Sequence, residues 1–218
     1  MKKYKFILSF FLISGFSLQS LGKGGEILQL IQAQYKSISS FSGKFVQISY
    51  KSNVEIPPKK AEGRVSYKRP GKMRWFYSLP EEHLLVTNGK TLWLFDPLLE
   101  NVTVQKLKKI ADGTALSFLL GIGDLNKDFI HRGISQTLLP IQDGLIVELT
   151  PKKVNSNLAF IQIQVNPKTY DLKTILMMDK QGNYRKIGLN SIKYNLELED
   201  KLFEFKISED MEVIETGY

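Results

Sequence analysis

Few side chains in this 218-residue chain have the type and spacing that enzyme chemistry needs. The two histidines, His83 and His131, lie far apart, and neither has the spacing to a carboxylate cluster that is typical of a zinc site. The acid pairs Glu81-Glu82 and Glu199-Asp200 lie in turn-like segments, where solvated surface is more common than a glycosidase pair. We therefore predict no metal site and no cofactor.

The sequence also lacks the common nucleophile and phosphate motifs. It contains no cysteine, which excludes disulfides, thiolate nucleophiles, zinc fingers and iron–sulfur clusters. There is no Gly-x-Ser-x-Gly elbow, and Gly121-Ile122-Gly123 is typical of a helix-end turn rather than of a phosphate loop. We expect no catalytic residues, so the protein is predicted not to be an enzyme.

The first 22 residues have the composition of an export signal. Lys2, Lys3 and Lys5 precede an apolar run from Phe6 to Leu18, and Ser20-Leu21-Gly22 supplies small residues at a signal-peptidase site. About 13 apolar residues are too few to cross a membrane, which needs roughly 20. The sequence predicts cleavage after residue 22 and export to the periplasm, and without a cysteine the mature chain cannot be a lipoprotein.

A stretch of basic and aromatic residues raises the alternative of nucleic-acid binding. Lys68, Arg69, Lys72 and Arg74 are flanked by the aromatic residues Tyr67, Trp75, Phe76 and Tyr77, and basic residues beside aromatic ones are also found in single-stranded nucleic-acid binders. However, the formal net charge of +8 falls to +5 when the three signal-peptide lysines are removed. A solvated sheet face is the simpler interpretation, and we expect no nucleic-acid partner for an exported protein.

Hydrophobic periodicity predicts one helix followed by many strands. Residues 24–38 form an amphipathic helical pattern, and from residue 44 onward the period changes to two. Residues 161–165, 192–198 and 203–207 alternate strictly, which is typical of antiparallel strands with one apolar face. Recurrent turn signals such as Arg69-Pro70-Gly71 and Asn88-Gly89 suit a meander. We expect about ten or eleven strands in a single domain, residues 23–218.

One region breaks this pattern. Residues 108–128 show no period of two, and the short apolar helical stretch within them holds Leu116, Phe118, Leu119 and Leu120. A long insertion between two antiparallel strands is uncommon unless it is functional or disordered, and its apolar content argues against disorder. We interpret this segment as a lid over an apolar sheet face, although a docking loop for a partner would also fit.

The stretch from Gly63 to Val104 resembles the periplasmic outer-membrane lipoprotein carrier family, LolA. The resemblance rests on residues 63–75 (GRVSYKRPGKMRW), residues 87–93 (TNGKTLW), Phe95-Asp96-Pro97, Leu149-Thr150-Pro151-Lys152 and Phe45-x-Gln47, in the order found in the family. It implies a mainly β (α+β) fold, an open antiparallel half-barrel whose concave apolar face is covered by helices. Cargo would be acylated lipoproteins, taken from an inner-membrane exporter (LolCDE) and given to an outer-membrane receptor (LolB) where one exists, by a monomeric carrier.

The resemblance also implies the site residues. Arg69 of the Lys-Arg-Pro motif is implied to hydrogen-bond the lid in the closed, empty state. An aromatic that lines the cavity mouth in the family is replaced here by Met73, which stays apolar and flexible. Together with period-two spacing, the resemblance predicts a lipid-binding surface made of Phe45, Val65, Tyr67, Met73, Trp75, Tyr77 and Trp93.

A second functional class remains open at this level. Similar half-barrels occur in periplasmic sensors of the RseB kind, which bind lipid-bearing signals and control a partner protein. Such sensors usually carry a second domain, for which this chain has no room. A carrier is therefore the favoured interpretation.

Overall fold

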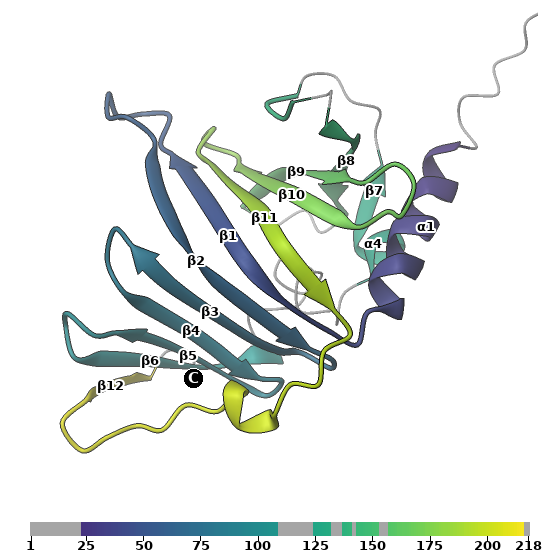
Figure 1. The fold of residues 1–218 in the computed structure, drawn as a ribbon. Helices are drawn as coiled ribbons and strands as arrows, with labels where there is room; N and C mark the ends of the chain where they lie inside the picture. Colours follow the sequence, from purple (N-terminus) through teal and green to yellow (C-terminus); the bar gives the residue numbers. More distant parts are fainter. Residues whose placement is uncertain (1–22, 109–123, 132–136, 141–142, 153–156, 216–218) are drawn as a thin grey trace, which may run out of the picture.

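A single curved sheet dominates the structure, a computed structural model that describes residues 23–108, 124–131, 137–140, 143–152 and 157–215 (Figure 1). The sequence-predicted signal peptide lies outside these residues. The helices are α1 (Lys23–Ser37), α4 (Leu125–Asp128) and the 3-10 helix η2 (Asp200–Phe203). The strands are β1 (Ser40–Tyr50), β2 (Lys59–Lys68), β3 (Lys72–Leu79), β4 (His83–Asn88), β5 (Thr91–Asp96), β6 (Asn101–Lys106), β7 (Phe129–His131), β8 (Leu145–Pro151), β9 (Leu158–Val165), β10 (Leu172–Asp179), β11 (Tyr184–Tyr194) and β12 (Glu212–Glu215).

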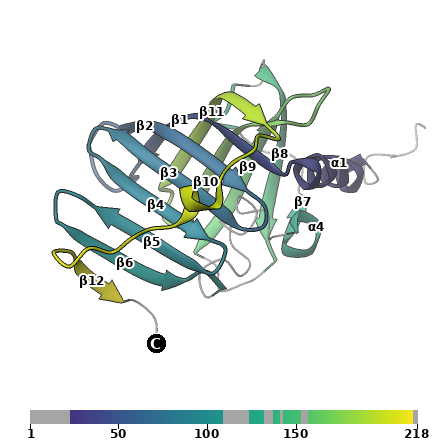
Figure 2. The ribbon, with the colours of Figure 1, turned by 60° about the horizontal axis from the view of Figure 1, so that its bottom comes forward.

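The twelve strands form one open sheet in the order β12-β6-β5-β4-β3-β2-β1-β11-β10-β9-β8-β7. Every pair is antiparallel except the edge pair β12–β6, which is parallel. Figures 1 and 2 show the sheet curling so that β7–β10 and β3–β6 lie on two sides of one concavity. The predicted open antiparallel half-barrel is confirmed, with slightly more strands than expected.

The predicted N-terminal helix is also confirmed. α1 places Leu28, Ile31 and Tyr35 on one buried stripe, as the spacing of apolar residues requires. That stripe packs at the concave face together with Leu125 of α4 and Phe129 of β7. No helix of the described residues is long and apolar enough to cross a membrane.

Period-two alternation divides the sheet into an inner and an outer face. Residues opposite each other in the register share a face of the sheet. Gly63 is opposite both Phe45 and Tyr77, and Val65 is opposite Trp75. All five residues therefore lie on the inner face. The main hydrophobic cluster is built on this inner face and continues through Ile175 and Ile187. The outer face carries a smaller cluster around Leu176, Ile146 and Leu139.

The C-terminal segment corrects two sequence predictions. β11 ends at Tyr194, so residues 195–198 of the predicted strand are not part of the sheet, and residues 203–207 form the end of η2 and an extended stretch instead of a strand. Their alternation has another physical origin. Phe203 is completely buried, and the Phe205 ring lies 6.5 Å from that of Trp93 and 5.3 Å from that of Phe95, between ring centroids. One-sided packing therefore produces the same pattern as a strand.

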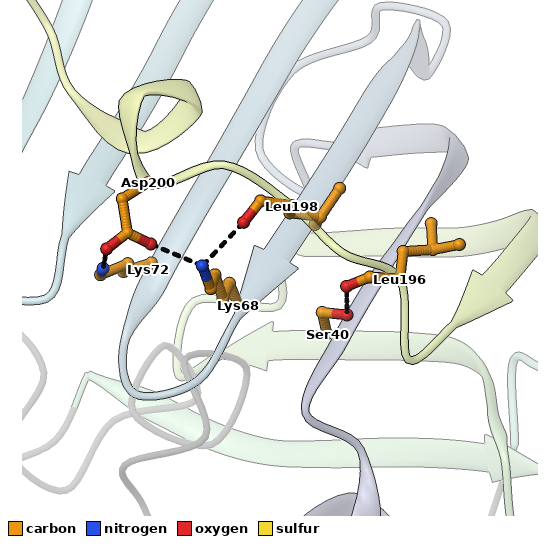
Figure 3. A network of polar contacts seen from close by, with 6 residues as sticks. All are labelled: Ser40, Lys68, Lys72, Leu196, Leu198 and Asp200. Carbon is orange, nitrogen blue, oxygen red and sulfur yellow. Dashed lines mark hydrogen bonds and ion pairs between the residues drawn. The ribbon is translucent and has the colours of Figure 1, made fainter.

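We call residues 195–211 the strap, because they run from β11 across the outer face of the sheet to β12 (Figure 2). Figure 3 shows how polar contacts fasten the strap. Ser40 Oγ donates to Leu196 O at 2.6 Å, and Lys68 Nζ donates to Leu198 O at 2.7 Å. The carboxylate of Asp200 pairs with Lys68 Nζ at 2.6 Å and with Lys72 Nζ at 2.7 Å.

Candidate binding site

A hollow of about 400 Å³ opens on the inner face of the sheet. It is lined mainly by apolar side chains, and β1, β3, β4, β5, β6, β10 and β11 contribute to it because the sheet is curved. The apolar lining consists of Trp75, Tyr77, Leu85, Leu92, Leu94, Met177 and Ile187. Such a surface is suited to hydrocarbon, because each buried methylene favours the apolar side by about 0.8 kcal/mol.

Four of the predicted cavity residues lie outside this hollow, at the end of the inner face nearest α1. Phe45, Val65, Tyr67 and Met73 are at most 1% exposed and belong to the main hydrophobic cluster. The Phe45 ring lies against Gly63, where a Cβ atom would come within 2.8 Å of that ring and 2.0 Å of Phe76 O. We call this region the packed end, and the region of the hollow the open end.

Trp75 and Tyr77 stand at the boundary between the two ends. Both line the hollow, and both rings contact Phe45 edge-on, with centroid separations of 4.6 Å for Trp75 and 4.8 Å for Tyr77. Trp75 is 6% exposed, and its indole N–H points to Met73 Sδ. These two predicted residues are therefore the ones that the structure brings into the hollow.

Trp93 is a correction to the sequence prediction. It is opposite Val86 in the register, while its neighbours Leu92 and Leu94 line the hollow, so the Trp93 side chain lies on the outer face. There its ring packs near Phe205 of the strap. Trp93 therefore belongs to the surface that the strap covers, and not to the inner cavity.

Arg69 holds the C-terminal end of α1. Its guanidinium donates through Nη2 to Tyr35 O at 2.7 Å and through Nε to Ile38 O at 3.3 Å. Its backbone N–H donates to Ser39 O at 2.8 Å. A cation at this position also interacts favourably with the helix dipole. Among the described residues, Arg69 thus hydrogen-bonds to the C-terminal end of α1, whereas the resemblance implied bonds to a lid; the predicted lid residues Leu116, Phe118, Leu119 and Leu120 lie outside the described residues.

Two tyrosines beside Arg69 are strongly desolvated. Burial raises the pKa of Tyr35 well above its usual value of 10.0, and the proximity of Tyr67 adds to this rise while Arg69 opposes it. Burial likewise raises the pKa of Tyr67, again opposed by Arg69. Within the described residues, Tyr67 Oη is a buried polar atom without a hydrogen-bond partner. Both phenols therefore stay neutral and serve packing rather than acid–base chemistry.

Sequence reasoning missed most of the lining of the hollow. Leu92 and Leu94 alternate with Trp93 and Phe95, so both faces of β5 are apolar and the period of two could not identify the inner one. The polar residues Gln47, Gln105 and Arg185 also line the hollow. Gln47 lies two positions after the inner residue Phe45, and Arg185 lies two positions before the inner residue Ile187. Once the strands are known, this spacing of two places both polar side chains on the inner face.

The described residues offer no obvious place for a metal ion, since no three histidine, aspartate or glutamate side chains gather there in a suitable arrangement. His83 at the start of β4 has Nδ1 3.6 Å from Asp96 Oδ2 and Nε2 3.7 Å from Glu81 Oε2. The chemistry that this arrangement supports is non-covalent binding of an apolar ligand.

Comparisons with known proteins identify the family of this chain. Residues 36–206 match the family model "Outer membrane lipoprotein carrier protein LolA". An outer-membrane lipoprotein carrier protein of Legionella pneumophila is 30% identical over 187 residues, which cover 85% of this chain and 88% of that protein. One from Azotobacter vinelandii is 33% identical over 153 residues, or 70% of this chain and 71% of that protein.

A solved structure supports the fold independently of sequence. An uncharacterised conserved protein from Thermus thermophilus superposes with a TM-score of 0.53 over 89% of this chain and 99% of its own, although only 14% of the residues are identical. This likeness concerns the fold alone, whereas the sequence matches extend over most of both chains. The chain belongs to the LolA family of outer-membrane lipoprotein carrier proteins.

Proposed function

We propose that this protein is a periplasmic carrier that shields the acyl chains of lipoproteins and moves them from an inner-membrane exporter to the outer membrane. The proposed carrier is residues 23–218 after removal of residues 1–22, acting as a monomer without catalysis or cofactor. Its cargo is the acylated lipoprotein. The donor is an exporter of the LolCDE kind, and the acceptor is a LolB-like receptor where one exists.

The observation that carries this proposal is the apolar hollow on the inner face of an open sheet. An acyl chain of roughly 15 methylenes prefers an apolar site to water by on the order of 12 kcal/mol. Two or three such chains cannot cross an aqueous compartment unaided. Trp75, Leu85 and Leu94 offer the required surface, and the open edge of the hollow leaves room for the polypeptide of the cargo outside.

A carrier must also release its cargo, and Arg69 supplies a means. A contact that favours the empty state lowers the net affinity for cargo, since binding must first break it. The bonds from Arg69 to Tyr35 O and Ile38 O hold α1 against the packed end, and hydrogen bonds to charged groups contribute about 1.5–3 kcal/mol. Arg69 is therefore the proposed latch, and the apolar segment containing Leu116 to Leu120 is the proposed lid.

Purification of the tagged protein from a native periplasm, followed by mass spectrometry, tests the carrier function. We expect several triacylated lipoproteins to co-purify. Leu94→Glu, which places a charge in the hollow, should lose them, whereas Leu138→Glu at an exposed position away from the hollow should retain them.

The same experiment separates the carrier from a sensor. A lipid-sensing regulator should bring down one signalling protein in a fixed ratio, whether or not lipoproteins are present. A single protein partner retained by Leu94→Glu, without any acylated cargo in the wild type, would contradict the carrier function.

A further inference from the structure

The hollow on the inner face is not uniformly apolar. Three polar side chains, those of Gln47, Gln105 and Arg185, and the hydroxyl group of Tyr77 interrupt its hydrocarbon lining. Three of these residues, Gln47, Tyr77 and Arg185, come from β1, β3 and β11, at the open end. Polar groups in a hydrocarbon site weaken the binding of acyl chains unless they bind a polar part of the ligand.

Gln47 is held in one orientation by its neighbours. Tyr77 Oη donates to Gln47 Oε1 at 3.1 Å, and Gln47 Nε2 donates to Ser49 Oγ at 3.2 Å. The amide oxygen is thus occupied, and one of the two Nε2 hydrogens remains for a ligand. Burial raises the pKa of Tyr77, while the positive charge of Arg185 opposes the rise, so the Tyr77 hydroxyl stays a donor.

Arg185 is the charged member of the group. It is opposite Ser49 on β1 and Met177 on β10, and it lines both the 400 Å³ hollow and an adjoining hollow of about 450 Å³. Within the described part of the chain, no carboxylate forms an ion pair with it.

The acid that shares the second hollow with Arg185 is already engaged. The carboxylate of Asp179 accepts from the backbone N–H groups of Gln181 and Asn183 and from Asn183 Nδ2. Desolvation acts to raise the pKa of Asp179, but these hydrogen bonds together outweigh it, so the pKa is lowered. Arg185 therefore lines both hollows as a cation with up to five N–H donors and without a carboxylate partner among the described residues.

The chemistry of acylated cargo matches this set of donors. Where acyl chains join a cysteine, the ester and amide carbonyls offer several oxygen acceptors and few donors. A site that takes the chains into hydrocarbon should therefore offer donors at its edge. We infer that Arg185, with Gln47 beside it, is a polar subsite that binds the carbonyl oxygens of the acylated cysteine while the chains lie among Trp75, Leu92 and Leu94. This inference rests on the proposed carrier function.

Binding measurements on purified protein with three probes test the subsite. A tripalmitoylated cysteine lipopeptide carries both chains and carbonyls, the neutral fluorophore N-phenyl-1-naphthylamine reports the apolar hollow alone, and palmitate offers a free carboxylate. Arg185→Leu should weaken lipopeptide binding by roughly 10- to 150-fold and leave naphthylamine binding unchanged. Arg185→Lys should be intermediate, because a charge remains but the planar fork is lost.

Arg64→Leu is the matched control, since Arg64 is an exposed arginine on the outer face of β2. It should change the binding of none of the three probes.

Two results for Arg185→Leu would overturn the subsite. One is a lipopeptide affinity within two-fold of the wild type. The other is an equal loss of affinity for naphthylamine, which would indicate that Arg185 serves packing. A larger loss for palmitate than for lipopeptide would overturn the assignment to carbonyls. A wild-type protein that binds naphthylamine but no lipopeptide would contradict the carrier function itself.

Discussion

The packed end and the open end of the inner face differ in whether other parts of the protein cover the sheet. At the packed end, the sheet is covered by other parts of the protein: Tyr35 and Ile31 of α1 lie in the same cluster as Tyr67 and Met73. At the open end the same strands continue, but Leu85 and Leu94 are only partly covered and line a hollow. One apolar sheet face thus serves as core along part of its length and as a binding surface along the rest.

Strand β3 passes from one region to the other within five residues. Met73 is completely buried, Trp75 is 6% exposed, and Tyr77 is half-buried at the hollow. The side chains on the inner side of this strand are all apolar or aromatic, so residue type does not distinguish structural from ligand-binding positions. The position of α1 along the sheet makes the distinction, and Arg69 fixes that position.

The largest expected effect separates the two ends directly. Met73→Glu places a carboxylate in the packed end, where Met73 has no exposed surface and lies in a cluster of apolar and aromatic side chains. We expect a loss of about 4 kcal/mol or more in the free energy of unfolding, because an unpaired charge would be buried. Denaturant titration followed by circular dichroism measures the loss.

Leu94→Glu is the partner of this experiment at the open end, since Leu94 is 37% exposed and lines the hollow. Its free energy of unfolding should stay within about 1 kcal/mol of the wild type, as is usual for exposed positions. Lipopeptide binding, in contrast, should fall at least ~10-fold. A stable Met73→Glu variant with selectively impaired lipopeptide binding would show that Met73 belongs to the ligand surface. It would contradict the division of the inner face into a structural end and a ligand-binding end.

This division explains which site residues the sequence could predict. Period-two spacing and the family resemblance group Phe45, Val65, Trp75 and Tyr77 on one face, and the structure has them on the inner face, because alternation reports the face of a strand. Alternation does not report how far along a strand α1 covers the inner face, since that depends on the position of α1 in the folded protein. Trp93 was misplaced for a different reason: β5 is apolar on both faces, and the strap that covers its outer face is more than 100 residues away in the sequence.

The fold itself was predictable to a greater extent. The helix at residues 24–38 and the antiparallel strands follow from local periodicity, and the structure confirms them. The strap was not predictable, because residues 203–207 alternate like a strand while Phe203 and Phe205 pack on the sheet without joining it. Alternation indicates one-sided burial, and ladder pairing is only one cause of it.

An intermediate effect is expected at Arg69, which hydrogen-bonds to the C-terminal end of α1. Arg69→Leu removes two charge-assisted bonds to Tyr35 O and Ile38 O. We expect the free energy of unfolding to fall by about 1.5–3 kcal/mol. If these bonds oppose cargo binding, lipopeptide retention should rise by up to roughly 10- to 150-fold, and loaded carrier should accumulate in the periplasm.

Arg69→Lys distinguishes geometry from charge at this position. The lysine keeps a cation near the helix end but cannot donate to both carbonyls in the planar arrangement, so retention should lie between wild type and Arg69→Leu. Lipopeptide release rates from pre-loaded protein measure the difference. Equal release rates for all three proteins would restrict Arg69 to a structural role at the end of α1.

The smallest effect is expected from the strap, which touches neither end of the inner face. The carboxylate of Asp200 accepts hydrogen bonds from Lys68 and Lys72. These bonds, with that from Lys68 the larger cause, lower the pKa of Asp200 from 3.8 to about 2. Because the folded-state pKa is lower than the unfolded one, the ion pairs contribute stability above pH 3.8, and this contribution is lost as the pH falls through about 2. The group is exposed, so the contribution is small and screened by salt.

Asp200→Asn should therefore lower the melting temperature by only ~1–2 °C at pH 7 and low ionic strength. The difference from wild type should shrink as the pH is lowered from 4 to 2, because the wild-type carboxylate becomes neutral as well. Lipopeptide affinity at pH 7 should not change, since Asp200 lies on the outer face with the strap (Figure 3). A clear loss of affinity in this variant would mean that the strap influences the curvature of the hollow, and the two ends could then no longer be treated as independent of the outer face.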